Sequence, residues 1–344
     1  MKFGIIKERK SPPDRRVVFT PEELLRLKEQ YPDAEIKVES SDIRIFTDQQ
    51  YADLGIEVVD DVSDCEVLFG VKEVPVYALI PNKKYFFFSH TIKKQVHNRE
   101  LLKAILDKKI DLYDHETIVD ENFKRLIGFG RYAGIVGAYN GIRAFGIKFE
   151  LFNLPKAETL SGKDALVERL RRLILPPVKI VLTGNGKVGN GAKEILQAMK
   201  IKEVSVENFL TKIYSEPVFV QIDVLDYNKR KDGNPSDKKD FYTNPTAYTS
   251  DFERFTKAAD IFMAGHFYGN DAPIILTRDM LRDNDCKIKV VADISCDVDG
   301  PIACTIKAST IAEPLFGYLA SEDKEVDVFH PGAIVVMSID NLPC

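Results

Sequence analysis

The clearest chemical signature in the sequence is the turn Gly184-Asn185-Gly186-Lys187-Val188-Gly189, whose glycines follow the spacing G-x-G-x-x-G. An apolar run at 179–183 precedes it and a helical pattern at 192–199 follows it, which is the setting of a dinucleotide-binding turn. There the first glycine permits a tight turn, the second lets the backbone approach a pyrophosphate, and the third lets helix and strand pack closely. The helix N-terminus adds unpaired N–H groups and a positive dipole. We therefore predict that this turn, including Lys187 and Val188, binds NAD or NADP; a structural turn is the alternative.

Three acidic residues are predicted to complete the cofactor site. An acid about 20 positions beyond such a turn usually binds the ribose hydroxyls of NAD, and Glu207 lies at a suitable distance. Three nearby lysines could instead neutralise the 2′-phosphate of NADP: Lys200, Lys202 and Lys212. The choice between NAD and NADP therefore stays open. Asp293 and Asp297 lie at the end of another apolar run, at the edge that faces the nicotinamide in a dinucleotide domain.

A second group of polar residues follows two earlier apolar runs. Lys72-Glu73 ends one run and Ser89-His90-Thr91 ends another. Open α/β sheets bind ligands beyond the carboxyl ends of their strands. A lysine and a histidine at that edge could transfer protons, because burial and neighbouring charges can bring the pKa of a lysine toward neutrality. A surface lysine and a capping histidine are the alternative.

Arg16 stands just before a change from strand to helix. An arginine there can grip a carboxylate through two hydrogen bonds, although a solvent-facing arginine is the simpler interpretation of the residue by itself. The remaining histidines have no metal-ligand spacing, so we predict no metal site: His97, His115, His266 and His330.

Strand and helix patterns alternate along both halves of the chain and predict an α/β fold of two Rossmann-like domains with parallel sheets and an interdomain cleft. Thr20-Pro21-Glu22-Glu23 has the residue types of a capped helix start. The glycine-rich stretch 128–146 would cost about 1 kcal/mol per glycine in a helix, so we expect it to approach the second domain closely and to mark the domain junction. The polar stretch 228–240 predicts a solvated excursion.

The composition excludes several classes of protein. The 344 residues carry 48 Lys and Arg against 53 Asp and Glu, a net charge of −5, which argues against a nucleic-acid-binding protein. The apolar start is too short for a signal peptide, and no stretch approaches the roughly 20 apolar residues of a membrane helix. The five cysteines form no C-x-x-C pair and fit reduced thiols. We expect a cytoplasmic enzyme without membrane or nucleic-acid partners; whether it forms homo-oligomers stays open.

Taken in order along nearly the whole chain, these motifs resemble the alanine dehydrogenase, transhydrogenase and saccharopine dehydrogenase family of two-domain amino-acid dehydrogenases. Within that family the sequence is most similar to the lysine–2-oxoglutarate reductase module of aminoadipic semialdehyde synthase. The resemblance rests on Gly70-Val71-Lys72, Phe87-Phe88-Ser89-His90-Thr91-Ile92-Lys93, Thr183-Gly184-Asn185-Gly186 with Gly191-Ala192, Asp293-Ile294-Ser295-Cys296-Asp297, Thr310-Ile311-Ala312-Glu313-Pro314 and Ser338-Ile339-Asp340-Asn341-Leu342-Pro343.

The resemblance implies a role for several residues. Lys72 and His90 match the acid/base pair of saccharopine dehydrogenases, and Asp297 matches an aspartate beside the nicotinamide. Substrate-side roles are implied for three further residues: Arg16, Arg125 and Glu116. The implied reaction is an NAD(P)-dependent interconversion of saccharopine with lysine and 2-oxoglutarate, by hydride transfer to an imine.

The resemblance also implies the domain boundaries. A substrate-side domain is expected at 1–135, joined by the segment from about 320 to 344, and a Rossmann domain at 136–319. Relatives continue beyond the position of Pro343, so we expect the first domain to be incomplete at Cys344. An alanine or opine-type dehydrogenase of the same family and a non-catalytic dinucleotide-binding protein are the alternative functions.

Overall fold

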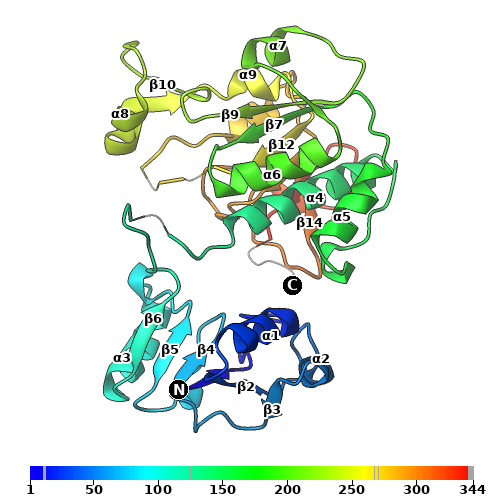
Figure 1. The fold of residues 1–344 in the computed structure, drawn as a ribbon. Helices are drawn as coiled ribbons and strands as arrows, with labels where there is room; N and C mark the ends of the chain where they lie inside the picture. The colour runs from blue at the N-terminus through cyan, green and yellow to red at the C-terminus, as the bar shows by residue number, and fades with distance from the viewer. Residues whose placement is uncertain (11–12, 124, 267, 270, 340–344) are drawn as a thin grey trace. The chain divides into compact units, whose positions relative to one another are not determined.

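The chain folds into two compact units, an N-terminal unit of Met1–Gly128 and a C-terminal unit that begins at Phe129 (Figure 1). The computed structural model describes residues 1–10, 13–123, 125–266, 268–269 and 271–339. Both units are built on parallel sheets with helices on their faces, so the predicted α/β class is confirmed.

The N-terminal unit contains a parallel sheet of six strands in the order β3-β2-β1-β4-β5-β6. Helices α1 and α2 pack on one face and α3 packs on the other. The strands are β1 (Lys2–Ile5), β2 (Glu35–Glu39), β3 (Glu57–Val59), β4 (Val67–Phe69), β5 (Lys84–Phe87) and β6 (Asp111–Asp114), and the helices are α1 (Pro21–Gln30), α2 (Asp48–Asp53) and α3 (Arg99–Asp107).

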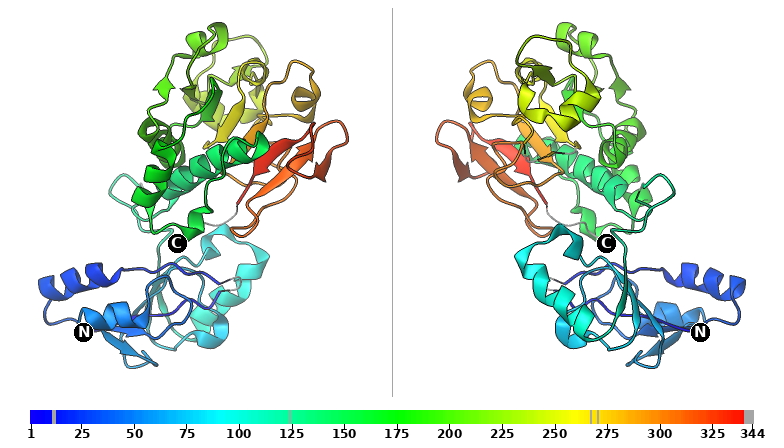
Figure 2. Two further views of the ribbon diagram at one scale, coloured as in Figure 1. Left: turned by 90° about the vertical axis from the view of Figure 1, so that its right-hand side faces the viewer. Right: turned by 90° about the vertical axis from the view of Figure 1, so that its left-hand side faces the viewer.

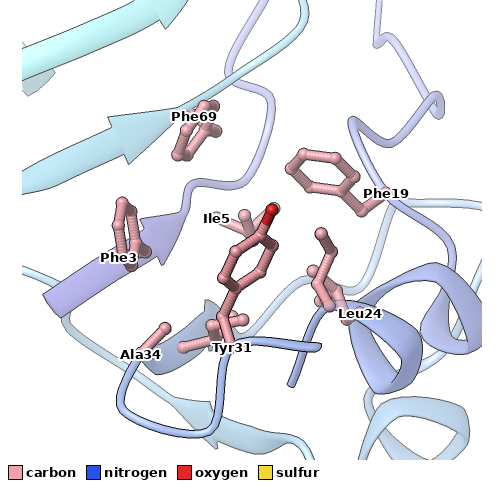
Figure 3. Close-up of a pocket in the computed structure, with 9 residues that line it drawn as sticks. Phe3, Ile5, Phe19, Leu24, Tyr31, Ala34 and Phe69 are labelled. Atoms are coloured by element: carbon pink, nitrogen blue, oxygen red, sulfur yellow. The ribbon is translucent and has the colours of Figure 1, made fainter. Parts of the chain in front are cut away.

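Helix α1 begins as the sequence predicts. The Thr20 hydroxyl accepts a hydrogen bond from the Glu23 backbone N–H, the Glu23 carboxylate accepts one from the Thr20 N–H, and Pro21 is the first helical residue. An apolar cavity of about 370 Å³ lies between α1 and the sheet (Figure 3). No charged side chain lines it; the lining residues are Phe3, Ile5, Phe19, Leu24, Leu27, Tyr31, Ala34, Ile36 and Phe69.

The C-terminal unit contains a sheet of eight strands in the order β15-β14-β16-β13-β12-β7-β9-β8, parallel except for the pairings of β14 with β15 and β16. Its strands are β7 (Lys179–Thr183), β8 (Lys202–Glu203), β9 (Val218–Ile222), β12 (Ile261–Ala264), β13 (Val290–Asp293), β14 (Leu315–Leu319), β15 (Lys324–Val326) and β16 (Ile334–Met337). Its helices are α4 (Gly130–Lys148), α5 (Lys163–Arg171), α6 (Lys187–Ala198), α7 (Val206–Thr211), α8 (Lys238–Thr243), α9 (Glu253–Thr256) and α10 (Arg278–Arg282).

The glycines of α4 make close contacts inside the C-terminal unit, whereas the sequence predicted an approach to the second domain. Helices α4 and α6 lie side by side in both views (Figures 1 and 2). A Cβ on Gly134 would lie 1.9 Å from the Val188 carbonyl oxygen, and one on Gly191 would lie 2.1 Å from the Arg131 carbonyl oxygen. Only glycines at these points let the two backbones come so close, so the whole helix belongs to this unit and the boundary falls after Gly128 instead of at 135.

Two other segments differ from expectation. Strands β14, β15 and β16 pair within the C-terminal sheet, so the described part of the segment 320–344 does not join the N-terminal sheet; residues 340–344 lie outside the described part. The reason is burial, because every residue of β16 is buried between β13 and β14. The polar stretch 228–240 contains β10 (Asn228–Arg230) and the start of α8, and β10 pairs antiparallel with β11 (Tyr248–Ser250) further along the chain. No helix among the described residues is long and apolar enough to cross a membrane.

Candidate functional site

The glycine turn joins β7 to α6, and each glycine has a separate steric reason. Gly184 has a φ of +94°, and a Cβ there would lie 2.5 Å from the Gly265 carbonyl oxygen. A Cβ on Gly189 would lie 1.9 Å from the Gly184 carbonyl oxygen. A Cβ on Gly186, which caps α6, would meet nothing within 4 Å. The outer glycines are thus needed for packing, whereas Gly186 leaves open space where a ligand can approach the backbone.

A cavity of about 470 Å³ lies against this turn. It is lined by Gly184, Asn185, Gly186, Lys187, Val188, Asp223, Val224, Tyr227, Lys238, Tyr242, Gly265 and His266. The open glycine turn, the N-terminus of α6 and the polar residues along one wall fit the pyrophosphate and a ribose of a dinucleotide. When bound, such a cofactor would supply or accept hydride.

The acid that lines this cavity is Asp223, not Glu207. Strand β8 has two residues and lies at the sheet edge, while β9 pairs directly with β7 and ends just before Asp223. Glu207 is exposed in the first turn of α7. The apolar run 218–222 followed by Asp223 was the sequence signal for this position, and it was missed because the distance along the chain favoured Glu207.

Asp223 is held by an ion pair. Its Oδ2 lies 2.6 Å from the Lys238 Nζ, and its Oδ1 accepts a hydrogen bond from the Val224 N–H. Burial acts to raise the pKa of Asp223, but the hydrogen bonds from Lys238 and Val224 outweigh it, so the pKa is lowered. Lys238 and Tyr242 come from α8, so the polar stretch 228–240, predicted as a solvated excursion, in fact brings Lys238 to the cavity, and Tyr242 follows just beyond that stretch.

Asp293 and Asp297 are placed differently from each other. Asp293 is fully buried, and its carboxylate accepts hydrogen bonds from the Ser295 hydroxyl at 2.6 Å and the Thr305 hydroxyl at 2.6 Å. Both oxygens therefore hold the loop after β13, and a contact of Asp293 with the cofactor stays a prediction. Asp297 lies further along that loop and is exposed, and its contact with the nicotinamide stays a prediction.

The second group of predicted residues gathers at the carboxyl edge of the N-terminal sheet. Strands β4, β5 and β6 are neighbours in that sheet, and each is followed within three residues by one predicted site residue: Lys72 after β4, His90 after β5 and Glu116 after β6. The backbone of His90 adopts the left-handed conformation with a φ of +53°, which is uncommon for a residue other than glycine and often marks functional positions. The parallel sheet therefore brings together residues that are 18 to 44 positions apart in the sequence.

His90 lies between two carboxylates. Its Nδ1 is 3.1 Å from the Glu116 Oε2, and its Nε2 is 3.6 Å from the Glu73 Oε1. The Arg125 Nη1 lies 3.4 Å from the other oxygen of Glu116. The carboxylate beside Nδ1 holds the imidazole ring in one orientation, which suits a histidine that transfers protons.

Lys72 is part of a half-buried charge cluster. Burial lowers the pKa of Lys72, and the positive charges of Arg16 and Lys10 lower it further. The guanidinium of Arg16 is held by both oxygens of Asp14, with a distance of 2.9 Å from Nε to Oδ1. This contact fixes the orientation of Arg16, whose positive charge acts on Lys72. Asp14 was not predicted, because no local pattern identifies the partner of an arginine.

Glu8 is a second residue that the sequence analysis missed. It is buried, and its two carboxylate oxygens accept hydrogen bonds from the backbone N–H groups of Val71 at 2.7 Å and Lys72 at 2.9 Å. Burial raises the pKa of Glu8 to about 7, against the effect of these hydrogen bonds. Glu8 therefore holds the backbone of Lys72 in place and so positions its side chain.

The sequence and the fold are similar to those of known proteins. Residues 4–136 match the family described as alanine dehydrogenase/PNT, N-terminal domain. Over 382 aligned residues the chain is 28% identical to the alpha-aminoadipic semialdehyde synthase of Arabidopsis thaliana, covering 99% of this chain and 36% of that protein. It is 24% identical to the saccharopine dehydrogenase [NAD(+), L-lysine-forming] of Yarrowia lipolytica, covering 78% of this chain and 68% of that protein.

The chain is a homologue of these dehydrogenases. The predicted resemblance is therefore confirmed. A solved L-alanine dehydrogenase has the same fold, with 19% identity, a TM-score of 0.60, and coverage of 100% of this chain and 83% of that one. The chain spans little more than a third of the length of the aminoadipic semialdehyde synthases that it matches.

Proposed function

We propose that the protein is an NAD(P)-dependent oxidoreductase that interconverts saccharopine with lysine and 2-oxoglutarate. The observation that carries the proposal is the position of His90 between Glu73 and Glu116, at the sheet edge that also carries Lys72. The positive charge of Arg16 lowers the pKa of Lys72 there. The names of the homologues support this substrate class, since they include L-lysine-forming saccharopine dehydrogenases.

In the proposed reaction the ε-amine of lysine adds to the keto carbon of 2-oxoglutarate and forms a carbinolamine. Loss of water gives an imine, and hydride addition at carbon with protonation at nitrogen gives the secondary amine of saccharopine. A bound reduced dinucleotide supplies the hydride. Lys72, with its lowered pKa, accepts the proton that the attacking amine loses, and His90 donates the proton that converts the departing hydroxyl to water.

The positive charges of Arg16 and Lys72, which are close enough to influence each other, suit substrates that carry several carboxylates. Asp14 restricts the guanidinium of Arg16 to one orientation, so less side-chain freedom is lost when a carboxylate binds. Arg125 is a further carboxylate-binding candidate through its contact with Glu116.

The test is an assay of the whole chain. Oxidation of NADH and of NADPH is followed with lysine plus 2-oxoglutarate, and in parallel with pyruvate plus ammonia. Turnover in the first mixture is expected. Turnover only in the second would favour an alanine dehydrogenase, and cofactor binding without turnover in either would favour a non-catalytic dinucleotide-binding protein.

A further inference from the structure

His266 is a buried side chain at the dinucleotide cavity with one unused nitrogen. It follows β12, is 7% exposed, and lines the cavity together with the glycine turn. Its Nδ1 lies 2.7 Å from the hydroxyl of the fully buried Thr183. Its Nε2 has no hydrogen-bond partner among the described residues. Buried polar atoms in folded proteins are almost always paired, so this nitrogen is expected to meet a ligand.

The position of His266 within the sheet indicates which part of a ligand it would meet. Strand β7, which carries the glycine turn, lies between β9 and β12. Asp223 follows β9 and His266 follows β12, so the two residues lie on opposite sides of the turn. If Asp223 binds the adenosine ribose and the turn binds the pyrophosphate, the next group of the cofactor beyond the pyrophosphate is the ribose that carries the nicotinamide.

The chemistry of the imidazole fits a ribose hydroxyl. Burial lowers the pKa of His266 to about 4, so the ring is neutral near pH 7. A neutral imidazole has one N–H donor and one acceptor, and a hydroxyl can serve either. The contact with Thr183 holds the ring, and His266 lies directly under the turn, since a Cβ on Gly184 would be 2.8 Å from the His266 Cα.

We propose that the Nε2 of His266 forms a hydrogen bond with the nicotinamide-side ribose of the bound dinucleotide. This inference rests on the proposed function, because it requires that the cavity binds a dinucleotide. It adds a binding residue that the glycine motif and the comparisons leave unassigned, and it assigns that residue to one half of the cofactor.

The test compares a series of ligands that contain successively larger parts of the cofactor. Dissociation constants for AMP, ADP, ADP-ribose and NADH are measured by calorimetry on the full chain and on His266→Phe, which keeps a flat ring and removes both nitrogens. We expect the variant to bind ADP-ribose and NADH about 5- to 10-fold more weakly, the usual loss for one hydrogen bond, and AMP and ADP within about twofold of wild type. His330→Gln, a change of an exposed histidine in the same unit, is the matched control and should change nothing.

Three outcomes would overturn the inference. If His266→Phe binds each of the four ligands as tightly as wild type does, Nε2 makes no contact with the cofactor. If the variant loses affinity for all four ligands to the same extent, AMP included, the substitution has only a structural effect. Failure of wild type to bind NADH or ADP-ribose would refute the proposed dinucleotide site, and the inference with it.

If His266→Phe does not fold, the wild-type chain labelled with ¹⁵N-histidine replaces it. The Nε2 signal of His266 should shift with ADP-ribose and stay in place with AMP; no shift with ADP-ribose contradicts the inference.

Discussion

The Oδ2 of Asp223 lies 2.6 Å from the Nζ of Lys238 at the cavity beside the glycine turn. This ion pair joins the end of β9 to α8, two elements that are 15 residues apart along the chain. In the proposed dinucleotide site this pair would meet the part of the cofactor at which NAD and NADP differ, because NAD offers ribose hydroxyls there and NADP a 2′-phosphate.

Replacement of Asp223 by alanine should change the cofactor preference. We expect the dissociation constant for NADH to rise about tenfold, through loss of a charged hydrogen-bond acceptor. NADPH should lose less affinity, because Lys238 is then available to its phosphate. Fluorescence titration of both cofactors measures the change, with Glu207→Ala as the control. A loss of NADH affinity in the control alone would restore Glu207 as the ribose-binding acid.

Lys72→Met and His90→Gln should each lower turnover by about 100-fold or more, the usual contribution of general acid–base catalysis. Cofactor affinity should stay unchanged, since both residues belong to the N-terminal unit. Steady-state rates and NADH titration separate the two effects. Lys103→Met, on the exposed face of α3, is the matched control. Rates equal to wild type would remove these residues from the mechanism.

The pH profile should respond to Lys10. A neutral Lys72 accepts the proton, so kcat/KM rises with pH through the lowered pKa of Lys72. Lys10→Gln removes a positive charge that lowers this pKa and leaves the negative charge of Glu73, 3.5 Å from the Lys10 Nζ, without that partner. Both effects raise the pKa of Lys72, so the rising limb should move to higher pH. A limb that moves to lower pH contradicts the assignment.

Glu8 should make stability depend on pH. Its pKa rises from 4.5 to about 7 on folding, so the folded state binds a proton more tightly than the unfolded state. The resulting contribution is complete below pH 4.5 and is lost as the pH rises through about 7, on the order of 3 kcal/mol. Denaturant unfolding followed by circular dichroism between pH 4 and 8 should show this dependence in wild type and its loss in Glu8→Gln. Glu29→Gln, on the exposed side of α1, should behave as wild type.

Gly134→Ala should destabilise the C-terminal unit by about 2 kcal/mol or more, because the new Cβ would overlap the Val188 carbonyl oxygen and push α4 from α6. Gly128→Ala, where a Cβ meets nothing within 4 Å, should have little effect. Thermal unfolding compares the two variants. Equal melting temperatures would show that the two helices can separate at no cost.

Local features of this protein follow from the sequence alone. The glycine turn between a strand and a helix, the capped start of α1, and the places of Lys72 and His90 after apolar strands depend on residues within a few positions of one another. Short-range sterics and hydrogen bonds decide such features, and these are visible in the order of residue types.

Only the tertiary structure decided which residues distant in the sequence contact one another. Asp223 replaces Glu207 because strand order, not distance along the chain, determines which acid stands beside the glycine turn. The contacts of Glu8 with the Lys72 backbone span 63 to 64 positions, and the glycines of α4 meet a helix of the same unit. These contacts form only when the sheets assemble, because the burial of apolar strands brings distant residues to one edge. A charge that is buried there is stable only if it is paired or hydrogen-bonded by a residue at the same edge.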